Sequence, residues 1–404
     1  MRRTVEEGSD IGARAGTTAA ARQASSRSAA RWALTAVFAT DGMVFASWSS
    51  RLPRIEATVH ADNGGLGIAL LGTALGAFVA MPVTGWLCRN IAPRLVVLVA
   101  LGLLCGGVLL PGLASSPGAL LLTLLVFGAG YGSVDVSMNA AAVEIGAEVG
   151  RPILPSFHAA FSIGALVGAT AGGLAGAAAI PVEAHLAVVA AIAAGCLVAV
   201  ARPLAGRSGP TGRRPVRRES IRLRLALPAL LVAAMLTFGS AFGEGATATW
   251  AAVHLSQDAH TSAGVAPLGF AIFSLAEAVG RMTGTQLTER WGAGRVVGAG
   301  AVLAAGGFVL TLVPVLAVLL VGYLAAGLGL SCLFPLGIAR AGRAAGSVGV
   351  SVASLLGYAG FLVGPPLVGL LASATNLTVA LGVPVVLAVG IIVVAAIGSV
   401  SEEP

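Results

Sequence analysis

Long apolar runs, separated by short polar or charged segments, follow one another along almost the whole chain. Each run holds about 18 or more mostly apolar residues, enough for an α-helix to cross a hydrocarbon layer about 30 Å thick. A transmembrane barrel would instead show segments of about ten residues with alternating polarity. The pattern therefore predicts a helical membrane protein with spans at residues 32–50, 66–87, 95–113, 119–147, 156–178, 184–201, 225–251, 264–288, 296–313, 316–339, 348–372 and 378–399.

The composition fits a protein that lies mostly in a membrane. Of the 404 residues, 57% are hydrophobic and 10% are charged, and the mean hydropathy is +0.93. Soluble domains carry about 25% charged residues, so the chain is not typical of them. The four cysteines are scattered singly, without the Cys or His spacing of a metal site. No nucleophile–base set or phosphate loop is apparent, so we expect neither an enzyme nor a bound cofactor.

The arginines gather in the polar segments on one side of the predicted spans. Placing both termini in the cytoplasm puts the arginines of residues 1–31 and 202–224 inside and leaves only Arg51 and Arg54 outside. This asymmetry follows the positive-inside rule, so we expect a multi-pass protein of the cytoplasmic (inner) membrane and no nucleic-acid partner. Residues 1–31 lack apolar periodicity and are predicted to be a disordered cytoplasmic tail. Residues 202–224 are predicted to be a basic cytoplasmic linker.

The linker separates two sets of six spans, which suggests a duplicated unit. The first span holds the pair Asp41-Gly42, and the seventh holds the pair Glu244-Gly245 at an equivalent place. Short charged loops also follow the second and the eighth spans. We therefore expect two domains, residues 32–201 and residues 225–404.

The segment TERWGAGR, after the eighth span, resembles the loop motif Gly-x-Leu-Ala-Asp-Arg-x-Gly-Arg-Lys of the major facilitator superfamily. Glu289, Arg290 and Arg295 fall on or near its charged positions. The loop after the second span departs from the motif, with Arg89 and Asn90 where Asp and Arg are usual. The fourth and fifth spans look like the fucose-permease-like branch of bacterial permeases. The resemblance implies an all-α fold of twelve transmembrane helices in two six-helix bundles, which rock around a midplane site to give alternating access.

The fourth span carries a polar face in an otherwise apolar helix. An α-helix turns by about 100° per residue, so Tyr131, Asp135 and Asn139 lie on one narrow face. An ionisable side chain in lipid costs roughly 2.5–3.5 kcal/mol, so this face is predicted to line a cavity. In the superfamily the fourth span lines the central cavity, which makes Asp135 a candidate proton carrier. A buried acid that is hydrogen-bonded only for packing is the alternative.

Two further acids lie in spans that line the cavity by the same resemblance. Proton-coupled sugar permeases of the fucose type use acids in the first and fourth spans, and Asp41 and Asp135 match those places. Glu244 in the seventh span mirrors Asp41. The candidate proton-coupling residues are therefore Asp41, Asp135 and Glu244. A kink at Gly42, or hydration near the surface, would also explain Asp41.

The other charges in or beside the spans are candidates for ion pairs or gating. Glu277 and Arg281 are four residues apart, in the favourable order for an intrahelical pair. Glu144 faces away from the polar side of the fourth span, and we expect a structural pair there with Arg151. His158 would assist proton release near neutral pH or hydrogen-bond to a loop or to Glu144. With the loop charges, the candidates of this kind are Glu277, Arg281, Glu289, Arg290, Arg295, Glu144, Arg151 and His158.

Amide and aromatic side chains are the candidate solute contacts: Asn139, Tyr131, Trp48 and Tyr323. Tryptophan also anchors spans at membrane interfaces. The sequence favours a monomeric secondary transporter in the lipid bilayer. We expect it to take up a small polar solute together with protons, with the proton gradient as the driving force. By resemblance the solute is sugar-like. A proton antiporter that exports metabolites or drugs, and a transport-inactive membrane sensor, stay open as alternatives.

Overall fold

The structure is a computed structural model, and all regular secondary structure in its described residues is helical. The described residues are 28–149, 154–205 and 223–400.

The helices follow the apolar runs of the sequence. In the first half, a helix over residues 28–49 is followed by α2 (Leu52–Val59), α3 (Asn63–Asn90), α4 (Pro93–Gly107), the 3-10 helix η1 (Leu110–Leu113), α5 (Pro117–Val149), α6 (Leu154–Ala177) and α7 (Val182–Ala205). In the second half come α8 (Leu223–Gln257), α9 (Leu268–Trp291), α10 (Ala293–Leu310), α11 (Leu316–Leu330), α12 (Leu333–Ala374), α13 (Leu377–Ala380) and α14 (Val383–Val400). Within α12 the backbone is not helical at Ala345 and Gly346, so α12 is two helices joined at a kink.

The number of membrane-crossing helices agrees with the predicted twelve. Among the described residues, 10 helical segments are long and apolar enough to cross a membrane. The helix over residues 28–49 and α9 are not among these segments, but they coincide with the predicted first and eighth spans. Both contain charged residues within the span, Asp41 in the former and Glu277 with Arg281 in the latter, which makes them less apolar than their neighbours.

The predicted N-terminal tail and the predicted linker are both shorter in the structure than the sequence suggested. Residues 28–31 of the predicted tail are helical and begin the first helix, and residues 1–27 lie outside the described residues. Residues 202–205 of the predicted linker belong to α7, and residues 223–224 belong to α8. A helix that crosses a membrane can continue into water, where polar residues no longer mark its end.

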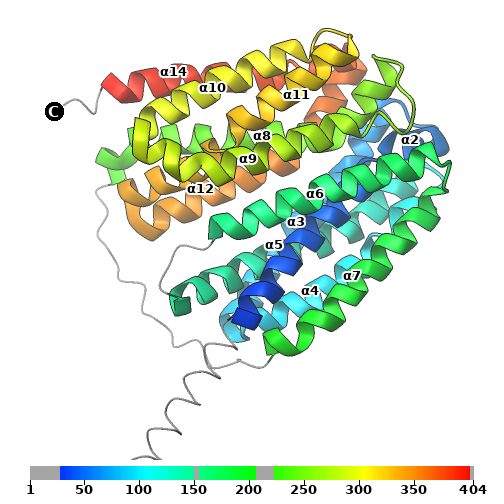
Figure 1. Cartoon of the computed structure of the whole chain (residues 1–404), viewed down its shortest axis with the longest axis horizontal. Coiled ribbons are helices and arrows are strands. Elements are labelled where there is room, and N and C mark those ends of the chain that lie inside the picture. The colour runs from blue at the N-terminus through cyan, green and yellow to red at the C-terminus, as the bar shows by residue number, and fades with distance from the viewer. Residues whose placement is uncertain (1–27, 150–153, 206–222, 401–404) are drawn as a thin grey trace, which may run out of the picture.

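The long helices run in roughly the same direction, along the long axis of the molecule (Figure 1). The end at which α7 finishes and α8 starts is called the linker end, and the opposite end, which carries α2, is called the α2 end. Residues 28–205 form one group of helices, the N-bundle, and residues 223–400 form the other, the C-bundle. The bundles meet where α3 packs on α12 and where α6 packs on α9.

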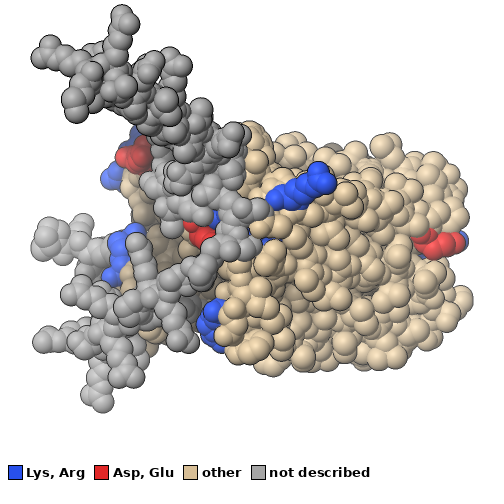
Figure 2. All heavy atoms as spheres, turned by 90° about the horizontal axis from the view of Figure 1, so that it is seen from below, with Lys and Arg blue, Asp and Glu red and all other residues tan. Residues whose placement is uncertain are grey.

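The surface between the two ends is apolar. Figure 2 shows charged side chains near both ends, with a broad uncharged region between them. Large side chains are fully open there, such as Phe78 at 71% and Val198 at 76% of their possible exposure. Exposed apolar side chains on this scale are typical of a surface that contacts lipid rather than water.

The residue pairs Asp41-Gly42 and Glu244-Gly245, which the sequence placed at equivalent positions, make equivalent helix contacts in the two bundles. A Cβ atom added at Gly42 would overlap the carbonyl oxygen of Phe161 in α6. A Cβ atom added at Gly245 would overlap the carbonyl oxygen of Phe361 in α12. Each glycine therefore allows a close helix crossing directly beside an acidic residue, and the two crossings lie at corresponding places in the halves of the chain.

Replacement of Gly42 by Ala should lower the free energy of unfolding by about 1–3 kcal/mol, because the added methyl group has to displace the α6 backbone. Gly195→Ala is the matched control, since a Cβ atom there meets nothing within 4 Å. It should be neutral or slightly stabilising, because alanine has the higher helix propensity. Unfolding of the purified proteins in detergent measures both effects, and equal stability of the two variants would contradict the proposed crossing.

Candidate solute and proton site

Asp41 is fully buried in the middle of the helix over residues 28–49. Its exposed fraction is 0%, and neither carboxylate oxygen has a hydrogen-bond partner among the described residues. Asp135 of α5 is close enough for the two carboxyl groups to interact electrostatically. A carboxylate with no partner is costly to bury, so the surroundings of Asp41 suit a carboxyl group that carries a proton.

Asp135 is held by hydrogen bonds from both bundles. The Asn139 side-chain amide donates to the Asp135 carbonyl oxygen at 2.9 Å and to its Oδ1 at 3.1 Å. The Tyr358 hydroxyl of α12 also hydrogen-bonds to the Asp135 side chain. Tyr131, one turn away, interacts with Asp41, Asp135 and Glu244. The structure thus brings the predicted polar face of α5 together with the acids of two other helices.

Tyr358 is a site residue that sequence reasoning missed. It lies in the second part of α12, which the resemblance did not mark as lining the cavity, and a lone tyrosine in an apolar run carries no local signal. Its contact with Asp135 joins the C-bundle to the N-bundle in the middle of the molecule.

A layer of aromatic rings covers these acids on the side of the α2 end. Phe45 lies 5.1 Å from Tyr131 and 5.6 Å from Phe361, measured between ring centroids. Trp48 lies 5.4 Å from Phe127 in the same way. Rings from both bundles therefore separate the buried carboxyl groups from the α2 end.

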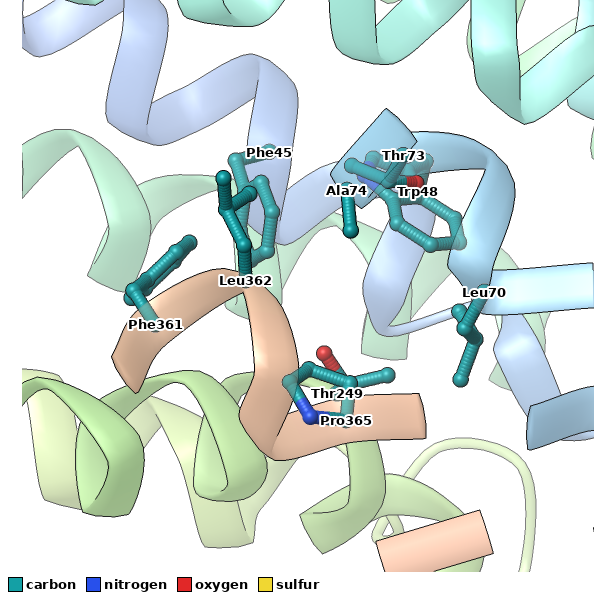
Figure 3. A pocket seen from close by; sticks show the side chains of 9 residues that line it. All are labelled: Phe45, Trp48, Leu70, Thr73, Ala74, Thr249, Phe361, Leu362 and Pro365. Carbon is teal, nitrogen blue, oxygen red and sulfur yellow. The ribbon is translucent and has the colours of Figure 1, made fainter. Parts of the chain in front are cut away.

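A small pocket borders this aromatic layer (Figure 3). It is lined by Phe45, Trp48, Leu70, Thr73, Ala74, Thr249, Phe361, Leu362 and Pro365. The Trp48 indole nitrogen and the Thr73 hydroxyl are buried and have no hydrogen-bond partner among the described residues. Because no charged side chain lines the pocket, it suits an uncharged group that accepts hydrogen bonds.

Arg281 of α9 connects two acids of the C-bundle with the N-bundle. Its Nη2 lies 2.8 Å from Glu277 Oε1, in the pair that the spacing predicts, and 3.1 Å from Glu244 Oε2. Its Nη1 donates to the Ser162 hydroxyl of α6 at 2.6 Å. Glu244 and Glu277 lie close enough to act on each other electrostatically. The sequence did not indicate that Glu244 and Ser162 share this arginine.

His158 lies near this network, at the start of α6. Its ring meets the ring of Phe38 edge-on at 5.5 Å, and its charge would interact with that of Arg281. The structure therefore places His158 within electrostatic range of Arg281, and its hydrogen bond to a loop or to Glu144 stays a prediction.

Glu144 forms a structural ion pair with Arg94. Its Oε2 lies 3.2 Å from Nε of Arg94, which is fully buried at the start of α4. Arg151, the expected partner, lies outside the described residues. Arg94 belongs to the loop after the second span, 50 positions before Glu144 in the chain. Helical spacing therefore could not indicate this ion pair.

The loop charges of the family motif are exposed. Glu289, Arg290 and Arg295 all lie on the surface at the α9–α10 turn. Across the described parts of the chain no ion pair joins them, and their role in gating or pairing stays a prediction.

Tyr323 belongs to a separate network near the α2 end and not to the central group. Its hydroxyl lies 2.9 Å from His254 Nδ1, and His254 Nε2 lies 3.3 Å from Asp258 Oδ2. The Thr378 hydroxyl donates to the same Asp258 oxygen at 2.5 Å. The hydrogen bond from His254 lowers the pKa of Asp258. The i, i+4 spacing of His254 and Asp258 was a signal for this network that the sequence reasoning did not use.

The two bundles touch closely at the α2 end. The Gln257 side chain of α8 reaches Glu56 of α2 in the other bundle, at 2.9 and 3.1 Å from its carboxylate oxygens. Gly67 of α3 packs so tightly on Gly369 of α12 that a Cβ atom on either would collide with the other. The α2 end is therefore closed in this conformation.

Within the described residues, no three His, Cys, Asp or Glu side chains are arranged to hold a metal ion. Of the carboxyl groups in the central site, Asp135 is instead paired with Asn139 and Tyr358, and Glu244 and Glu277 are paired with Arg281.

Comparison with known families and proteins gives a consistent result. A model of the Major Facilitator Superfamily matches residues 31–244 and, a second time, residues 233–404. A protein of Sinorhizobium fredii named as an uncharacterized transporter, y4wD, is 30% identical over 348 residues, which covers 84% of this chain and 90% of that protein. An uncharacterized MFS-type transporter of Yersinia pestis is 29% identical over 353 residues, which covers 84% of this chain and 88% of that protein.

Solved structures show the same fold at much lower identity. A variant of the nucleoside transporter NupG superposes with a TM-score of 0.69 and 15% identity, covering 93% of this chain and 100% of that one. Likeness at this level of identity concerns the arrangement of helices and not the solute.

Replacement of Arg281 by Gln should lower the free energy of unfolding by about 3–5 kcal/mol, because it leaves buried acids without their guanidinium partner. The double variant Arg281→Gln with Glu277→Gln should recover part of this loss, since one of those acids is then neutral. Unfolding in detergent at pH 7 measures both. Losses that simply add in the double variant would show that the two residues do not act as a pair.

Proposed function

Because this chain belongs to the Major Facilitator Superfamily, a family of membrane transporters, we propose that it moves a small, uncharged polar solute by alternating access, together with protons. The relatives named above are themselves named as transporters. In this proposal solute and protons move in the same direction, into the cell.

The observation that carries proton coupling is a group of four buried or partly buried carboxyl groups, of which only two pair with a guanidinium group. Asp41, Asp135, Glu244 and Glu277 come from three different helices of the two bundles and from α9, and Arg281 is the cation among them. Buried charges of one sign without partners are strongly unfavourable, so the group has to hold protons. A change of access from one side of the membrane to the other would change how tightly it holds them.

The candidate solute contacts lie beside these acids. Asn139 and Tyr131 share a face with Asp135, and Trp48 and Thr73 supply unpartnered donors in the adjoining pocket. A neutral solute with several oxygen atoms could accept these hydrogen bonds and stack on the aromatic layer. A sugar-like solute has these properties, which agrees with the resemblance of the fourth and fifth spans.

The orientation in the membrane follows from the charges. Arg89, Arg290, Arg295 and Arg343 are exposed near the linker end, and the positive-inside rule then places that end in the cytoplasm. The α2 end faces outward in this orientation. The closed contacts of α3 with α12 at the α2 end then describe a state shut toward the outside.

Asp135→Asn should abolish gradient-driven accumulation in proteoliposomes while leaving exchange of solute across the membrane intact. The solute is first chosen from a library of uncharged metabolites by its thermal stabilisation of the purified protein. One proton moved across 100 mV contributes about 2.3 kcal/mol, roughly a fortyfold concentration of solute, and the variant should lose this factor.

Glu183→Gln serves as the control, because Glu183 is an exposed carboxylate away from the central site. Accumulation by the Asp135 variant at the level of this control would rule out Asp135 as a coupling residue. An outward proton flow during uptake would indicate exchange of solute against protons instead of joint uptake.

A further inference from the structure

Glu56 is an acidic residue on the buried side of a short helix. The helix α2 turns its residues Leu52, Ile55, Glu56 and Val59 toward the protein. Glu56 is only 8% exposed, although it lies outside the membrane-spanning helices. A carboxylate among apolar residues at a helix interface costs free energy unless a partner or a proton compensates it.

The partner of Glu56 comes from the other bundle. The Gln257 side-chain nitrogen lies 2.9 Å from Glu56 Oε1 and 3.1 Å from Oε2, and it also lies 3.3 Å from Asn63 Oδ1 of α3. Gln257 is the last residue of α8. One amide group of the C-bundle thus bridges two helices of the N-bundle at the α2 end.

This bridge lies where the bundles must part if the α2 end is to open. Gly64 and Gly67 of α3 pack against Ser373 and Gly369 of α12, so a separation of these helices would also carry Gln257 away from Glu56. Water would then reach the Glu56 carboxyl group. The closed and the open state therefore give Glu56 two very different surroundings.

We propose that Glu56 is a proton-binding site, separate from the central acids, whose protonation stabilises the closed α2 end. The site goes beyond the proposed function, because it neither contacts the solute nor belongs to the group around Arg281. In the predicted orientation it takes its proton from the outside.

The sign of the effect follows from the two surroundings. Burial raises the pKa of Glu56 from 4.5 to about 7 in the closed state, while the Gln257 hydrogen bond acts in the opposite direction. Asp62, at the start of α3, is the charged group that acts on Glu56, and it raises the pKa further; α8 presents the neutral Gln257. In water the pKa returns toward its ordinary value, so the closed state binds the proton more tightly than the open state.

The closed α2 end is consequently favoured below pH 7 and loses stability as the pH rises toward 7. Between about pH 4.5 and 7 one proton is taken up when the α2 end closes, so each pH unit in this window changes the ratio of closed to open molecules by up to tenfold. The ratio levels off below about pH 4.5, where Glu56 is protonated in both states, and above about pH 7, where it is ionised in both.

The test is a distance measurement across the α2 end in nanodiscs between pH 5.5 and 8.5. Spin labels go on Ala57→Cys in α2 and Ala374→Cys at the end of α12, both exposed positions, in a chain whose four native cysteines are replaced. The wild-type background should show mostly the short, closed distance at pH 5.5 and a long-distance population that grows up to about pH 7 and changes little above it. The Glu56→Gln variant, which resembles protonated Glu56, should stay closed over the whole range.

Two controls keep the result specific. Glu183→Gln removes an exposed carboxylate and should keep the wild-type pH profile, and a closed distance in Glu56→Gln equal to that of the wild type at pH 5.5 shows that the variant is folded. A pH response in Glu56→Gln equal to that of the wild type would overturn the proposal and assign the response to other acids. A wild type that does not respond to pH would overturn it as well. Asp135→Asn should keep the response, so this test can fail or succeed independently of proton-coupled transport.

Discussion

One largely buried cation, Arg281, links the two bundles through α9 and α6. Arg281 is surrounded by Glu277 and Glu244 of its own bundle and donates to Ser162 of the other. A guanidinium group offers five N–H donors in a fixed plane, which allows it to serve both acids and a hydroxyl at once. Any relative movement of α6 and α9 has to break or remake the contact with Ser162. The charge that holds the acids in place is therefore also a link between the moving parts.

The aromatic layer and the closed α2 end complete this picture. Phe45, Tyr131 and Phe361 bring rings of both bundles together directly beside the acids. Farther toward the α2 end, Gly67 and Gly369 allow the backbones of α3 and α12 to touch. Closure thus rests on two layers of different chemistry, one of flexible ring contacts and one of close backbone packing. Ring contacts can rearrange around a solute, whereas the glycine contact either forms or is broken.

The sequence predicted the parts of the fold that depend on local pattern. Apolar runs located the helices because a span needs a continuous length of apolar residues, and the four-residue spacing located the pair of Glu277 with Arg281. The polar face of α5 was predicted because Asp135 and Asn139 repeat with the helical period. The ends of the predicted tail and linker were wrong, because helices extend past the apolar run.

Contacts between distant segments could not be predicted in the same way. Glu144 pairs with Arg94, and Asp135 contacts Tyr358. In each pair the two residues lie on different helices. Tyr323 was selected as an aromatic residue in a cavity-lining span, but its hydroxyl faces His254, and the direction of one side chain in an apolar helix has no signature in the sequence. The roles proposed for the central residues follow from these contacts between helices, which only the folded chain supplies.

The two kinds of acidic site respond differently to the same proton concentration. The central carboxyl groups lie behind the aromatic layer, so a proton from the outside reaches them only while the α2 end is open. Glu56 lies at that end itself, and its proton favours closure because the closed state buries the carboxyl group between helices. Acid on the outside would therefore fill the central site in the open state and then favour the closed one. Closure after filling is the order that joint uptake of solute and protons requires, since an end that closed before the central site was filled would return it empty.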